Sequence, residues 1–138
     1  TDLDDQLGNY LAYSKYNIKS ERDASKLIYE GKEKPAIWWY EGQIKQAKDK
    51  QKQAKLYLEL ATYLNALVRD DKTRYSLALK YASKAEELVH NSDSAGVLAE
   101  IYDRANDRSN YTKYLQLSNE RRSKEGKSSG DKNGLSAS

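Results

Sequence analysis

The sequence predicts an all-α fold built from antiparallel helical hairpins stacked side by side. Three apolar stripes with the i, i+3, i+4, i+7 spacing of half-buried helices follow one another between Ala78 and Ser118. The chain shows no sustained period-two alternation, so nothing in it indicates a strand. The three stripes are Ala78, Tyr81, Ala82, Ala85 and Leu88; Leu98, Ile101, Tyr102 and Ala105; and Tyr111, Tyr114, Leu115 and Ser118.

Two short helices are expected at the start of the chain. The first spans about residues 4–16, is capped by an aspartate and has Leu7 on its inner side. Gly8 lies inside it and disfavours a helix by about 1 kcal/mol relative to alanine, which indicates a close contact with another helix. The second helix begins at Ser20 and stops at Gly31, because glycine is favoured just beyond a helix end.

The middle of the chain, residues 35–69, contains long stretches without a helix breaker. Pro35 starts a helix, because proline is tolerated in the first turn. One unbroken helix over 36–69 would be about 50 Å long, which is unusual in a small domain, so we expect a turn near 49–52. The helix after this turn is apolar on two faces, as is typical of a central helix packed on both sides.

Three further helices are expected at 74–90, 94–105 and 108–121, which gives six or seven in all. Asn and Asp residues precede the last two, where side-chain caps are favoured. The following residues are mostly Ser, Gly, Lys and Asn with no apolar stripe. We therefore predict a helical-repeat domain over 1–122 and a disordered polar tail over 123–138.

Composition excludes several kinds of site. The chain has no cysteine, hence no disulfide or thiolate, and one histidine cannot build a typical zinc site. Its 24 basic and 21 acidic residues give a net charge of +3, unlike a dedicated nucleic-acid binder. No apolar run approaches the roughly 18 residues of a membrane span. No nucleophile with a neighbouring base and no phosphate-binding glycine loop stand out, so we expect no enzyme, no metal and no cofactor.

The end of the helical region resembles the tetratricopeptide repeat (TPR), a helix-turn-helix unit of 34 residues. The pattern of this family opens its inner helix with a leucine and a small residue, followed one turn later by a tyrosine. A turn comes next, and then small and aromatic positions on the outer helix. The corresponding residues here are Leu98-Ala99, Tyr102, Asn106-Asp107, Tyr111, Leu115 and Ser118. A preceding unit over 58–91 would have Leu64 and Val68 on its inner helix and Ala78 and Ala85 on its outer helix. Another match over 35–68 uses Trp38, Gly42, Ala54, Leu58 and Ala61, and it overlaps the unit over 58–91, so the two cannot both be regular repeats.

This resemblance implies a short TPR-like α-solenoid with a concave face that binds a peptide. We therefore expect a non-enzymatic scaffold or adaptor for a protein or peptide partner. The chain begins at Thr1 and contains no methionine, so we expect it to be either a processed form or a domain cut from a longer protein. A periplasmic or extracellular location is favoured over a cytoplasmic one.

The most aromatic candidate site is Trp38-Trp39-Tyr40 with Gly42. Adjacent helical positions point about 100° apart, so the two indoles cannot face the same strip of core. One interpretation is a binding surface, because aromatic anchors dominate interface energies and glycine permits close approach. The other is that both tryptophans are buried between hairpins, as large aromatics more often are.

Lys45, Lys48, Lys52 and Lys55 form a basic stripe if their helix is continuous. A solvated face is the ordinary interpretation of such a stripe, and attraction of an acidic partner is the alternative. Two other functions stay open at this point. The first is an exported binder of small ligands or cell-wall glycans that uses the tryptophans, and the second is a nucleic-acid-associated accessory protein that uses the lysines.

Overall fold

The computed structural model describes residues 2–66 and 72–126, and α-helices account for most of them. No strand occurs in this part of the chain, so the all-α prediction is confirmed for it. The helices are α1 (Asp2–Tyr16), α2 (Glu21–Tyr29), α3 (Glu33–Gln46), α4 (Lys50–Asn65), α5 (Lys72–Val89), α6 (Ser92–Arg104) and α7 (Arg108–Lys124).

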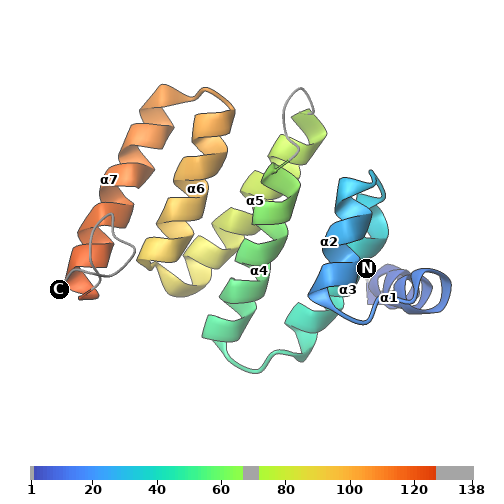
Figure 1. Cartoon of the computed structure of the whole chain (residues 1–138). Helices are drawn as coiled ribbons and strands as arrows, with labels where there is room; N and C mark the ends of the chain where they lie inside the picture. Colours follow the sequence, from blue (N-terminus) through green and yellow to red (C-terminus); the bar gives the residue numbers. More distant parts are fainter. Residues whose placement is uncertain (1, 67–71, 127–138) are drawn as a thin grey trace.

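The helices form an elongated row in which two sets alternate (Figure 1). One set is α2, α4 and α6, and α4 contacts both of the others. The second set is α3, α5 and α7, each packed on the helix before it, while α3 and α5 also contact the helix after them. α1 packs on α3 and lies across the end of the row (Figure 1). Each described helix therefore contacts only its near neighbours.

The helix ends follow the local signals in the sequence. The side chains of Ser20, Asp49 and Asp107 accept hydrogen bonds from backbone N–H groups in the first turns of α2, α4 and α7. Asn91 and Ser94 form a reciprocal capping box at the start of α6. Gly31 has a φ of 85°, which places it in the left-handed conformation that ends α2 as predicted.

Three boundaries differ from the predictions. The turn between α3 and α4 lies at 47–49, slightly before the expected 49–52, because Asp49 caps α4. α3 begins two residues before Pro35, which occupies its first turn. α7 continues to Lys124, two residues beyond the predicted start of the tail after 122. The remaining predicted tail, 127–138, lies outside the described residues.

The core combines a few large side chains with many small ones. Ala78, Ala82 and Ala85 are fully buried on α5, which packs between α4 and α6. Leu98 on α6 is only 2% exposed, which confirms its predicted core position, whereas Tyr102 is half-buried and stacks on Tyr114. Small residues let helices approach closely, and this explains how a chain with a modest apolar fraction packs in thin layers.

A polar junction joins the turn between α5 and α6 to α7. Arg121 donates two hydrogen bonds to the Glu86 carboxylate, at 2.7 and 2.8 Å, and a third to the Asn91 carbonyl. The backbone N–H and the hydroxyl of Ser92 donate to Glu125, at 2.9 and 2.6 Å. Burial raises the pKa of Glu86, but the hydrogen bonds from Arg121 and Ser94 outweigh it and leave the pKa below its ordinary value.

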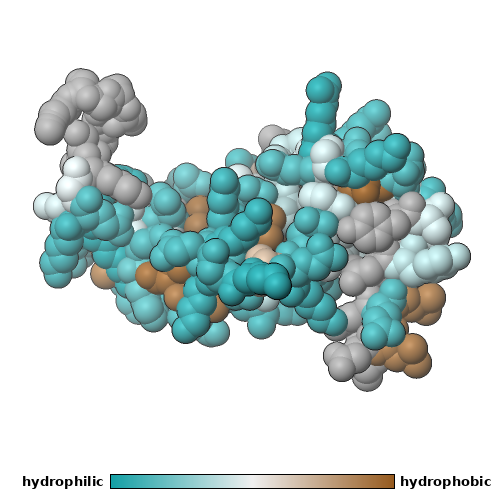
Figure 2. Space-filling model, turned by 90° about the horizontal axis from the view of Figure 1, so that it is seen from below, coloured by the Kyte–Doolittle hydropathy of each residue, from teal (hydrophilic) through white to brown (hydrophobic). Residues whose placement is uncertain are grey.

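α1 exposes apolar side chains that the stripe pattern placed inward. Leu7 is 55% exposed, so its predicted inner position is wrong, and Tyr10 is 65% exposed. α1 contacts only α3 among the described helices, so only a narrow face of it is buried. In Figure 2, hydrophobic atoms stand out at this end of the molecule, while hydrophilic side chains cover most of the rest of the visible face.

Substitution of Leu98 by alanine should destabilise the protein by about 2–5 kcal/mol, because it leaves a cavity at a fully packed site. Urea denaturation of the purified variant measures this loss. Leu115→Ala is the matched control, since Leu115 on α7 is 39% exposed and should lose less than about 1 kcal/mol. Equal losses for the two variants would contradict the assignment of Leu98 to the core.

A chain that ends after Arg122 should be less stable than one that ends after Gly126. The shorter chain loses both hydrogen bonds between Ser92 and Glu125, and bonds to a charged group each contribute about 1.5–3 kcal/mol at most. The melting temperature of the two truncated chains, measured side by side with the full chain, tests this. A shorter chain as stable as the full one would show that these bonds add nothing to stability.

Candidate functional site

The tryptophan cluster lies mostly inside the fold. Trp39 is 7% exposed, and Tyr40 and Gly42 are also buried. The rings of Trp39 and Tyr40 meet edge to face, with centroids 5.0 Å apart. The structure therefore favours the packing interpretation for these three residues over the binding-surface one.

Trp38 is the half-buried member of the cluster, as its divergence from Trp39 predicts. Its ring lies directly over Gly8 of α1, and a Cβ atom at Gly8 would come within 2.6 Å of it. The predicted close contact at Gly8 is thus confirmed. The ammonium group of Lys34 lies 5.6 Å from the centroid of the Trp38 ring. Helix α1, rather than open solvent, covers much of this indole.

The lysines do not form one continuous stripe. Lys45 lies in the last turn of α3, Lys48 in the turn that follows, and Lys52 near the start of α4. The chain changes direction at 47–49, between α3 and α4. A continuous stripe would have required a single helix through this region, so the lysines do not share one face. All three side chains are exposed, and Lys52 lines a groove beside α4 together with Lys55.

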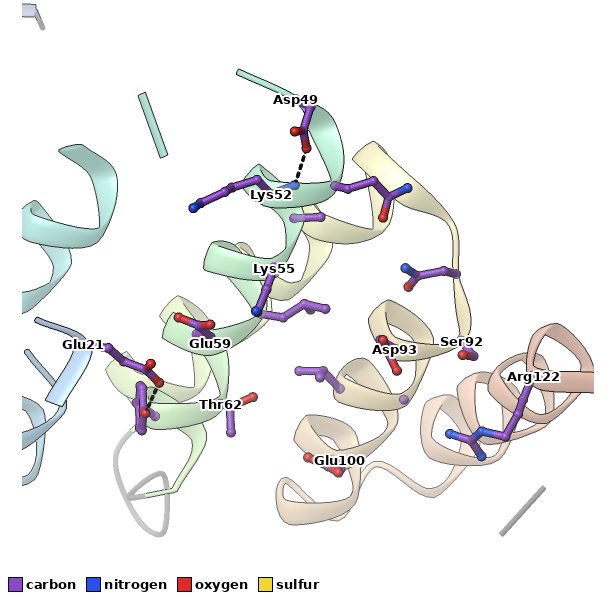
Figure 3. A pocket seen from close by; sticks show the side chains of 17 residues that line it. Glu21, Asp49, Lys52, Lys55, Glu59, Thr62, Ser92, Asp93, Glu100 and Arg122 are labelled. Atoms are coloured by element: carbon purple, nitrogen blue, oxygen red, sulfur yellow. Dashed lines mark hydrogen bonds between the residues drawn. The ribbon is translucent and has the colours of Figure 1, made fainter. Parts of the chain in front are cut away.

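This groove lies between α4 and α6 and has a volume of about 900 Å³. Glu21 of α2 and Arg122 of α7 also line it (Figure 3). On α4 the lining positions recur at Lys55, Glu59 and Thr62, and on α6 at Asp93, Val97 and Glu100, each along one helical face. The groove therefore runs along α4 and α6, two consecutive helices of the set formed by α2, α4 and α6.

The floor of the groove is apolar. Ala54 is buried, and Leu58 and Val97 are half-buried on the two flanking helices. Gly96 belongs to the same floor, and a Cβ atom there would come within 3.3 Å of the Ser118 hydroxyl of α7. Partly buried apolar side chains at the base of a groove are suited to contact with an apolar group of a ligand.

The walls of the groove carry more acidic than basic groups. The basic groups are Lys52, Lys55 and Arg122, and the acidic ones are Glu21, Asp49, Glu59, Asp93 and Glu100. Figure 3 shows Glu59 on α4 and Glu100 on α6, the two helices that flank the groove. The excess of carboxylates contrasts with the net charge of +3 of the whole chain.

Glu59 is half-buried and Glu100 is exposed, and the pKa of each carboxylate is raised. Burial is the main cause that raises the pKa of Glu59, and nearby Glu21 raises it further, while Lys55 and Lys52 oppose the shift. Burial likewise raises the pKa of Glu100, and Arg104 opposes this. Each carboxylate would thus gain from an additional cation within the groove.

One end of the groove is both acidic and aromatic, and we call it the acidic end: Glu21, Glu59 and Tyr63, with Tyr29 beside them. The Tyr63 hydroxyl donates a hydrogen bond to Glu21. Burial, followed by this bond, raises the pKa of Tyr63 to about 12. The ring of Tyr29 meets that of Tyr63 edge to face, with centroids 6.2 Å apart, and Tyr29 is 53% exposed.

The described residues form neither a metal site nor a membrane span. No group of three or more His, Cys, Asp or Glu side chains in 2–66 and 72–126 is arranged to hold a metal ion. Within the same ranges, no helix has both the length and the apolarity needed to cross a membrane. The single histidine, His90, lies 3.4 Å from the Glu86 carboxylate at the polar junction and does not line the groove.

No protein-family model, curated protein or solved structure matches this chain. Functional inference therefore depends on the groove itself. Of the aromatic and basic candidates, only Lys52 and Lys55 line it. The sequence did not indicate Glu21, Glu59, Tyr63 and Val97 as a group, because they come from three different helices. The polar residues on the two-faced α4 were the available signal.

Gly8→Ala should loosen the contact between α1 and α3, because the added methyl group would meet the rigid Trp38 ring. We expect a net loss of about 1–2 kcal/mol, as overpacking outweighs the better helix propensity of alanine. The measurement is the quenching of tryptophan fluorescence by acrylamide, which should increase as Trp38 becomes accessible. Ser14→Ala, at an exposed position of the same helix, should leave quenching unchanged; identical behaviour of the two variants would count against the contact.

Proposed function

We propose that this protein is a non-enzymatic scaffold that binds a segment of another protein in the groove between α4 and α6. The observation that carries the proposal is the composition of this groove, an apolar floor between charged walls contributed by four helices. Protein-binding sites combine an apolar centre with a polar rim in the same way. Nothing in the groove resembles the paired nucleophile and base of a catalytic site.

The arrangement of the helices supports a finer interpretation, a short TPR-like α-solenoid. In it, α2–α3, α4–α5 and α6–α7 would be successive hairpins, and α2, α4 and α6 would line the concave face. The extensive packing of α4 along α5 favours the unit over 58–91 rather than the overlapping one over 35–68. The buried Leu98, Ala99 and Ser118 agree with the TPR-like positions of the last hairpin.

The alternative functions receive less support. A glycan platform would need both indoles at the surface, whereas Trp39 is buried and Trp38 lies against α1. A nucleic-acid site would need a concentrated basic surface, whereas the lysines are divided between two helices and a turn, and the groove is rich in carboxylates. A protein or peptide partner is the class that the groove accommodates best.

A groove-filling variant tests this function. Thr62 is exposed and lines the groove, so Thr62→Trp should obstruct it without disturbing the core. Peptides selected from a random phage-displayed library against the full chain serve as probes, and their affinity is measured by fluorescence anisotropy. We expect Thr62→Trp to weaken binding by about tenfold or more.

Thr112→Trp is the matched control, because Thr112 is exposed on α7 away from the groove. It should change the affinity by less than about twofold. Selection that yields no binding peptide, or equal weakening by the two tryptophan variants, would refute binding in this groove.

A further inference from the structure

The contrast between the groove and the rest of the chain indicates the charge of its partner. The molecule carries a net charge of +3, yet carboxylates outnumber basic groups on the groove walls. A basic segment would therefore be attracted locally to the groove, whereas an acidic one would be drawn to other surfaces. Complementary charge sets the register of a bound segment more than its total affinity.

The distribution of charge within the groove is uneven. Lys52 and Lys55 lie in the first half of α4, and Arg122 comes from α7. Glu59 and Glu21 lie at the acidic end, and Glu100 faces the groove from α6 (Figure 3). Lys55 lies one turn before Glu59 on α4, so a cationic group near Glu59 is best placed on the side of Glu21, which comes from α2.

The tyrosines at the acidic end add a second kind of attraction for a cation. Tyr29 is half-exposed and its ring adjoins Tyr63, whose hydroxyl is held by Glu21. An ammonium or guanidinium group within about 6 Å of a tyrosine ring is attracted electrostatically to the face of the ring. Elsewhere in this chain, Lys80 already lies over the Tyr81 ring at 5.2 Å and Arg108 over Tyr111 at 4.7 Å.

The apolar floor lies next to the acidic end in the helical register. Leu58 directly precedes Glu59 on α4, and Val97 lies one turn before Glu100 on α6. A ligand whose cation lies near Glu59 therefore has the apolar side chain of Leu58 close to that cation. Side chains two residues apart in an extended segment point to the same side, so a basic and an apolar side chain at positions i and i+2 fit this spacing.

We propose that the groove binds an extended protein segment with a lysine or arginine two residues from an apolar residue, the cation lying at the acidic end and the apolar side chain on Leu58 and Val97. This inference rests on the proposed function, because it names the chemistry of the partner for the same groove. An acidic or uncharged segment is the competing outcome.

Three fluorescein-labelled peptides of equal length test the proposal: GSRLSRLSG, GSQLSQLSG and GSELSELSG. Fluorescence anisotropy with the full chain, at low and at physiological ionic strength, gives their affinities. We expect the arginine peptide to bind about tenfold or more tightly than the glutamine peptide, and the glutamate peptide to bind weakest.

Glu59→Gln and Glu21→Gln should each weaken the arginine peptide by about fivefold while changing the glutamine peptide by less than about twofold. Glu87→Gln removes the same charge from an exposed position of α5 outside the groove lining, and should have little effect on either peptide. Melting temperatures of the three variants establish that each remains folded.

Different failures separate this inference from the proposed function. Equal affinity of the arginine and glutamine peptides, tightest binding of the glutamate peptide, or equal effects of Glu59→Gln and Glu87→Gln would overturn the preference for a cation. Library peptides without basic residues that compete at the groove would do the same, while leaving the scaffold function standing. If neither the three peptides nor any library peptide binds, both the inference and the function are wrong.

Discussion

Three alanines on α5 allow α4 and α6 to share one supporting helix. Ala78, Ala82 and Ala85 are fully buried, and α5 contacts both flanking helices of the groove. Protein interiors are close-packed, so a larger side chain at any of these positions would have to move one of its neighbours. The distance between α4 and α6, and with it the width of the groove, therefore depends on these alanines of α5, which do not line the groove themselves.

The polar junction supplies a second constraint at the far side of the groove. Glu86 and Arg121 pair through two hydrogen bonds, and Ser92 is held by Glu125 near the end of α7. Removal of one partner from such a partly buried pair leaves a charge without compensation, which is costly. The junction thereby fixes the position of α7, and with it Arg122 at the groove wall.

Local features were predictable from sequence, and tertiary ones were not. Ser20 and Gly31 act through their own backbone neighbours, so their roles at the ends of α2 could be deduced. The groove could not, because Glu21, Glu59 and Glu100 meet only after three helices pack. The tryptophans were candidate binding residues because of their type alone. Their burial depends on neighbours from other helices, such as Gly8 of α1 for Trp38, and the sequence does not show these neighbours. The last turn of α7 likewise depends on Glu125 reaching Ser92, 33 residues earlier in the chain.

The attachment of α1 has a consequence for how the molecule opens. Among the described helices α1 contacts only α3, whereas the groove is built by α2, α4, α6 and α7. In a row of elements that contact only their neighbours, the free energy of local opening is set by the few interfaces that each event breaks. Release of α1 breaks a single interface, so its amide hydrogens can exchange with solvent while the groove stays assembled. Helix α1 and the groove are thus separate cooperative units, and the opening of one need not alter the other.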